Sequence, residues 1–188
     1  MCLLGACGVP ATRAACPAGT RADGPRAAAI EARLGTVSEG RALLASRDRV
    51  AAICFGDPAS SSVITADRLV LLAGALEEGE AAARLGHLLV HAREGLPIDE
   101  VHAGLDEAAC DAAVERALML EARAYVVEVA LQDALGARPT TLAFEFAARL
   151  RATSEGEREG IVTAYLRAHP RGGPGIDGLA DAYRARCR

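Results

Sequence analysis

The sequence predicts an α+β fold that is mostly helical, with a small β-sheet placed before a histidine-bearing helix and more helices after it. Only 3% of the residues are aromatic, and alanine and leucine supply much of the hydrophobic half of the composition, which favours close-packed helices. Two short β-prone segments, at 50–56 and 62–74, precede a long stretch with helical periodicity. We therefore expect one helical domain built on a minor sheet.

The individual elements follow from periodicity and from breaks at glycine and proline. A helix is expected at 26–34, and a second at 36–46 with Thr36 or Ser38 as its cap. The two β-prone segments are expected to pair with each other. The remaining helices are expected at 77–93, 107–135, 140–151, 155–168 and 176–186.

The first residues resemble the end of a bacterial lipoprotein signal, although a basic start is missing and the apolar stretch is short. In "MCLLGAC", small residues precede Cys7, which is the candidate lipidation site. Residues 8–25 are rich in Gly, Pro, Ala and Thr and are typical of a linker. The predicted organisation is a leader and linker at 1–22 and a single domain at 23–188. The alternative is a frayed terminus of a cytoplasmic protein.

The cysteines support the same prediction of export. None of the six belongs to a CxxC pair, which argues against a cysteine zinc site. If Cys7 carries the lipid, an even set remains for two disulfides in an oxidising compartment, with three possible pairings: Cys16, Cys54, Cys110 and Cys187. The predicted location is the periplasm, or the outer membrane through a lipid tether. Four buried thiols are the alternative.

Charge and hydropathy limit the classes of partner. The net charge is −4 and no basic block occurs, so a nucleic-acid partner is not expected. No apolar run reaches the length of a membrane span, so only a lipid anchor would hold the chain at a membrane.

The stretch "AAARLGHLLVHAREG" places His87 and His91 four residues apart on a predicted helix. Residues at this spacing lie one turn apart on the same face, so both imidazoles can point at one ion. Glu94 lies too far along the helix to complete the site, because seven residues span about 10 Å of helix rise.

Glu121 is the candidate third ligand. It shares a helix face with apolar residues, where a carboxylate is costly unless it is paired or bound to a metal. Two imidazoles and one carboxylate form the ligand set of a catalytic-type zinc site, so Zn²⁺ is the expected cofactor. The alternative is an ion pair between Glu121 and an arginine such as Arg84. Glu115 and Glu128 on the same helix are expected to face solvent.

The β-prone segments, the helix with "HLLVH" and the following helix with "EARAY" resemble a gluzincin-type zinc metallopeptidase over about residues 48–135. The resemblance implies a zincin-like fold in which the histidine helix is of the active-site type and a helical subdomain follows. It implies that His87, His91 and Glu121 are the metal ligands, with Ala124 at the small-residue position after the glutamate.

The chain departs from this family at the general base. The family has a glutamate directly after the first histidine, and here Leu88 occupies that position. No catalytic residue is therefore assigned, although Glu80 or Glu94 could substitute. His102 and His169 are expected to be solvated, and Tyr125 to pack in the core.

These observations leave three functions open. The leading one is a catalytically impaired zincin-like domain that binds a peptide or protein partner. The second is an active zinc hydrolase that uses a different base. The third is a metal-free helical interaction domain.

Overall fold

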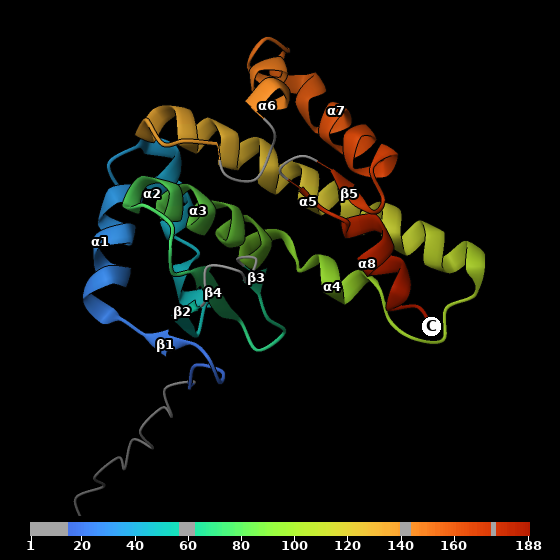
Figure 1. Cartoon of the computed structure of the whole chain (residues 1–188), viewed down its shortest axis with the longest axis horizontal. Coiled ribbons are helices and arrows are strands. Elements are labelled where there is room, and N and C mark those ends of the chain that lie inside the picture. Colours follow the sequence, from blue (N-terminus) through green and yellow to red (C-terminus); the bar gives the residue numbers. More distant parts are fainter. Residues whose placement is uncertain (1–14, 57–62, 140–143, 174–175) are drawn as a thin grey trace, which may run out of the picture.

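The computed structural model describes residues 15–56, 63–139, 144–173 and 176–188, and confirms a mostly helical α+β fold. The long helix α5 (Glu107–Leu135) runs through the molecule (Figure 1). The sheet and helices α1 to α3 lie at one end of α5, and α7 and α8 lie along its other half. Among the described residues, no helix combines the length and apolar character needed to cross a bilayer.

The sheet has four short strands in the order β1-β2-β4-β3. The central strands, β2 (Ala52–Gly56) and β4 (Leu69–Ala73), pair with each other as the sequence predicts, and the structure shows that this pairing is parallel. β3 (Val63–Ile64) and β1 (Arg21–Ala22) add antiparallel edges. The predicted segment 62–74 therefore contains two strands, and not one, because a turn at 65–68 folds β3 back onto β4.

Helix α1 (Gly24–Leu34) begins after Asp23, whose side chain accepts a hydrogen bond from the Arg26 amide at 3.1 Å. The predicted cap of the second helix is wrong. α2 (Ser38–Leu44) has Val37 at its N-cap, without a side-chain capping bond. The Thr36 hydroxyl donates to the Arg33 carbonyl at 2.7 Å, so Thr36 closes the end of α1. A short 3₁₀ turn, Arg47–Arg49, leads into β2.

Helix α3 (Glu78–Glu94) is the central element of the first core, because every residue from 81 to 92 is buried. It is surrounded by α1, α2, the sheet and α5. α3 ends at Gly95, and the short α4 (Pro97–Glu100) connects it to α5. This burial on all sides explains why alanine and leucine predominate in the helix.

The second core lies between the N-terminal half of α5 and the C-terminal helices. These are α6 (Phe144–Arg151), α7 (Glu155–Ala168) and α8 (Leu179–Ala185). α5 and α7 match their predicted ranges, whereas the first four residues of the predicted helix 140–151 lie outside the described residues.

The helix predicted at 176–186 begins later than expected. Ile176–Asp177 forms strand β6, which pairs with β5 at Gly172–Gly173. The chain then approaches itself closely, because a Cβ at Gly178 would lie 2.6 Å from the carbonyl carbon of Arg171. Helix α8 starts directly after this glycine.

Two disulfides join distant parts of the chain and resolve the three possible pairings. Cys16 bonds to Cys54 of β2, and Cys110 at the start of α5 bonds to Cys187 after α8. Residues 15–22, which the composition groups with a linker, are thus attached to the domain by a disulfide and by β1. The candidate lipidation site Cys7 lies outside the described residues.

Candidate metal centre

Helix α3 carries both histidines into the interior. Its N-terminus is fixed by a capping box, in which the Glu80 carboxylate accepts a hydrogen bond from the Glu77 amide at 3.1 Å. Two turns later, His87 and His91 are only 2% and 3% exposed. Because α5 packs along this part of α3, side chains of α5 face the two rings.

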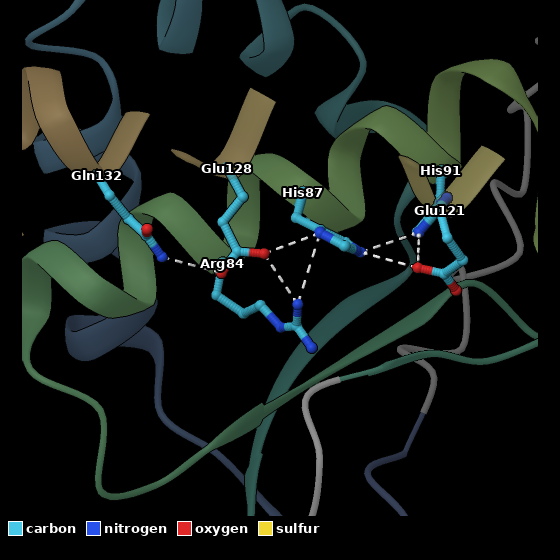
Figure 2. A network of polar contacts seen from close by, with 6 residues as sticks. All are labelled: Arg84, His87, His91, Glu121, Glu128 and Gln132. Carbon is cyan, nitrogen blue, oxygen red and sulfur yellow. Dashed lines mark hydrogen bonds and ion pairs between the residues drawn. The ribbon is translucent and has the colours of Figure 1, made fainter. Parts of the chain in front are cut away.

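The structure brings together the three residues that the sequence identifies. The Nε2 atoms of His87 and His91 are 3.0 Å apart, and Oε2 of Glu121 on α5 lies 3.4 Å from each of them (Figure 2). A tetrahedral zinc ion with bonds of about 2.0–2.1 Å holds its ligand atoms about 3.3 Å apart. The three atoms therefore have the spacing that a zinc ion requires.

Glu128 was expected to face solvent, and this expectation is wrong. The residue is fully buried, and its Oε2 lies 2.8 Å from Nδ1 of His87 and 2.9 Å from Nη1 of Arg84. Its Oε1 accepts a hydrogen bond from Gln132 at 3.2 Å (Figure 2). Glu128 occurs seven residues after Glu121. Seven residues make about two helical turns, so the two side chains lie on the same face of α5.

Glu128 determines which nitrogen of His87 is available for a ligand. A carboxylate next to Nδ1 keeps the proton on that atom, so Nε2 presents its lone pair. Arg84, the arginine considered as a partner for Glu121, pairs with Glu128. Burial is the largest single effect on the pKa of Arg84 and lowers it, but Glu128, Tyr125 and Glu121 together outweigh burial and hold this pKa above the ordinary value.

Glu121 is held from its other side by the C-terminal helix. The Tyr183 hydroxyl on α8 donates to Oε1 of Glu121, which leaves Oε2 directed at the histidines. Burial and the Glu121 charge both raise the pKa of Tyr183, so Tyr183 remains a donor. The rings of Tyr125 and His87 form a T-shaped contact, with the ring centroids 4.8 Å apart.

The ionisation of the centre suits a cation. Burial alone would raise the pKa of Glu121, but the charges and hydrogen bonds of His91 and His87 outweigh it and hold this pKa well below the ordinary value. Burial lowers the pKa of His91 despite the opposing effect of Glu121. The ionised carboxylate and the neutral imidazole are the forms that bind metals.

The histidine pair also contains a buried atom without a partner. Within the described part of the chain, Nδ1 of His91 is the buried side-chain nitrogen or oxygen that makes no hydrogen bond. Two imidazole nitrogens and a carboxylate oxygen that converge at 3.0–3.4 Å repel one another unless a proton or a metal ion lies between them. The donor set therefore fits a bound cation.

Among the residues that the structure describes, no carboxylate occupies the position of the general base of a gluzincin-type peptidase. Leu88 is buried beside the histidines. Glu80 belongs to the capping box, and Glu94 pairs with Arg93 at 2.6 Å on the exposed end of α3. Neither of the two candidate substitutes therefore reaches the site.

The other two histidines do not belong to the centre. His102 is exposed, as expected. His169 is half-buried, and its Nδ1 lies 2.9 Å from the Tyr165 carbonyl oxygen while its ring packs on the Tyr165 ring.

A pocket of about 210 Å³ adjoins the three candidate ligands. Its remaining wall is mostly apolar and comes from β3, α3, the turn into α4, and α8. The residues lining it are Val63, Ile64, Arg84, His87, Leu88, His91, Leu96, Pro97, Ile98, Glu121, Tyr125, Leu179 and Tyr183.

Three residues of this arrangement were missed at the sequence level: Glu128, Gln132 and Tyr183. Glu128 lies seven residues after Glu121, and Gln132 lies four residues after Glu128. This spacing places Glu128 and Gln132 on the same face of α5 as Glu121, and the sequence contains this signal. No local pattern identifies Tyr183, because its position depends on the docking of α8. No family model, no curated protein and no solved structure matches the chain.

Proposed function

We propose that the chain is an exported, zincin-like domain that binds a zinc ion through His87, His91 and Glu121 and that lacks the base of a peptidase. Its pocket binds a peptide or protein partner. The observation that carries this proposal is the convergence of two imidazole nitrogens and one carboxylate oxygen within 3.0–3.4 Å in a buried site.

The chain's own residues support binding more strongly than turnover. Bound zinc supplies a Lewis acid with an open coordination position. Glu128 keeps the Nδ1 proton of His87, and Tyr183 fixes the orientation of Glu121. Leu88 has no group that accepts a proton, and the loss of general acid–base help costs about 10²–10⁴-fold in rate.

The two rival functions have less support. An active hydrolase needs a base, but Glu80 and Glu94 are engaged elsewhere, and Glu128 already accepts hydrogen bonds from Arg84 and Gln132. A metal-free domain would need a proton on Nε2 of His91 between the three converging atoms, and Nδ1 of His91 would then be a buried acceptor without a partner, which is unfavourable.

The proposed export rests on the two disulfides, because such bonds persist in oxidising compartments. A periplasmic location and a lipid on Cys7 remain part of the proposal. Mass spectrometry of the protein from its native host, after proteolysis, tests for a lipid on Cys7.

Elemental analysis of the purified protein tests the metal centre. We expect about one zinc per chain in the wild type and none in the double variant His87→Gln/His91→Gln. The chain has four histidines, so His102→Gln/His169→Gln is the matched control and should retain its zinc. Absence of zinc from the wild type after zinc is supplied, or its retention in the first variant, would contradict the proposal.

A further inference from the structure

The described residues that form the wall of the pocket beside the metal centre include one carboxylate, that of the proposed ligand Glu121. Leu88, at the position of the family's base, forms part of this wall together with Ile64, Leu96, Ile98 and Leu179. In a peptidase of the resembling family, a base here would repel a bound anion. In this chain, the apolar Leu88 removes that repulsion.

The charges around the pocket favour an anion when zinc is bound. Glu128 and Arg84 form an ion pair, so their charges cancel. Glu121 contributes −1, the two histidines are neutral as ligands, and Zn²⁺ contributes +2. The centre then carries one net positive charge in a poorly solvated site, where an opposite charge is strongly attracted. The complementary ligand is a monoanion.

The size of the pocket limits the rest of the ligand. Its volume of about 210 Å³ is somewhat larger than a cavity of about 150 Å³ that binds benzene. One branched or aromatic group fits this space, whereas two neighbouring side chains of an extended peptide do not. The apolar lining favours a group without hydrogen-bonding atoms.

We propose that the pocket binds a free carboxylate joined to one compact apolar group. This inference rests on the proposed zinc centre. The carboxylate would lie at the metal and the apolar group against Leu88, Leu96 and Ile98. The same chemistry occurs in a small branched acid and in the last residue of a peptide that ends in leucine, and the experiment separates these two sources.

Calorimetric titration of the zinc-loaded protein tests the ligand class. We expect 4-methylpentanoate to bind at least tenfold more tightly than 4-methylpentanamide, which has the same shape without the charge. Acetate, which lacks the apolar group, should also bind at least tenfold more weakly. Equal binding of the acid and the amide, or no binding of the acid, would overturn the inference.

A second titration identifies the source of the carboxylate. The ligands are acetyl-Ala-Ala-Leu with a free carboxylate and the same peptide with a C-terminal amide. Tighter binding of the free peptide than of 4-methylpentanoate supports a peptide C-terminus as the ligand. Binding of the small acid alone supports a free acid. Failure of both carboxylates overturns the inference.

A matched pair of variants tests the role of Leu88. Leu88→Glu and Leu88→Gln have nearly the same shape and differ in charge. We expect the glutamate variant to bind 4-methylpentanoate at least tenfold more weakly than the glutamine variant, and equal affinities would contradict the charge argument. Zinc content is measured first in each protein. Zinc present without acid binding refutes only this inference, whereas no zinc in the wild type refutes the proposed function as well.

Discussion

Glu128 links the candidate metal centre to the buried charge of Arg84. We expect Glu128→Gln to lower zinc affinity about 10–100-fold, because His87 loses the carboxylate that fixes its tautomer. The free energy of unfolding should fall by about 3 kcal/mol, since Arg84 loses the charge of its carboxylate partner in the core. Competition with a chromophoric chelator and denaturant unfolding measure the two effects.

The control for this prediction is Glu115→Gln on the same helix. Glu115 pairs with Arg167 at the surface, where an ion pair contributes less than about 1 kcal/mol. This variant should retain its zinc affinity. If Glu128→Gln lost stability but kept full zinc affinity, Glu128 would serve only to balance Arg84.

For individual residues, the sequence predicts the candidate ligands better than the residues that hydrogen-bond to them. The spacing of His87 and His91 and the apolar surroundings of Glu121 are local signals, and the structure brings these residues together. Glu128 was misassigned to solvent because burial depends on which face of α5 meets α3. The seven-residue spacing places Glu128 on the same face as Glu121, but the contact of that face with α3 joins residues more than 40 positions apart and has no local signal.

Helices α3 and α5 approach each other closely at Gly86, next to the first histidine. A Cβ at this position would lie 2.2 Å from Cδ1 of Leu131, which is fully buried. We expect Gly86→Ala to lower the free energy of unfolding by about 1–3 kcal/mol through overpacking. In a Leu131→Ala background, Gly86→Ala should raise the free energy of unfolding by up to about 1 kcal/mol, because alanine forms helices better than glycine. Denaturant unfolding of the double-mutant cycle measures this change of sign.

Gly160→Ala in α7 is the control, because a Cβ there would meet no atom within 4 Å. This change should stabilise the protein by about 0.5–1 kcal/mol. A loss of stability for Gly86→Ala that persisted in the Leu131→Ala background would show that packing against Leu131 is not its cause.

The helices were predicted well because their signals are local. Asp106 caps α5 through the Ala109 amide at 2.8 Å, and Gly136 ends it in a left-handed conformation. Strands β1 and β6, of two residues each, were not predicted. β1 and β6 exist through pairing with other segments, and their own sequences carry no alternation that would identify them.

At the scale of the whole molecule, the two disulfides constrain different halves of the fold. The Cys16–Cys54 bond joins the N-terminal segment to the sheet, and the Cys110–Cys187 bond joins the two ends of the second core. They close loops of 38 and 77 residues, for which chain entropy predicts about 4 kcal/mol of stabilisation each. Only the second bond holds the segment that follows α8, the helix of Tyr183.

The two bonds should therefore have similar effects on stability and different effects on zinc. We expect Cys16→Ser/Cys54→Ser and Cys110→Ser/Cys187→Ser to lower the thermal midpoint by comparable amounts. Only the second variant should bind zinc more weakly, because a loosened α8 lets the Tyr183 hydroxyl leave Glu121 and the carboxylate loses its fixed orientation. Thermal unfolding and chelator competition measure the two quantities. Tyr183→Phe with both disulfides intact should reproduce the loss of zinc affinity, and a normal affinity in that variant would show that α8 acts on the centre in some other way.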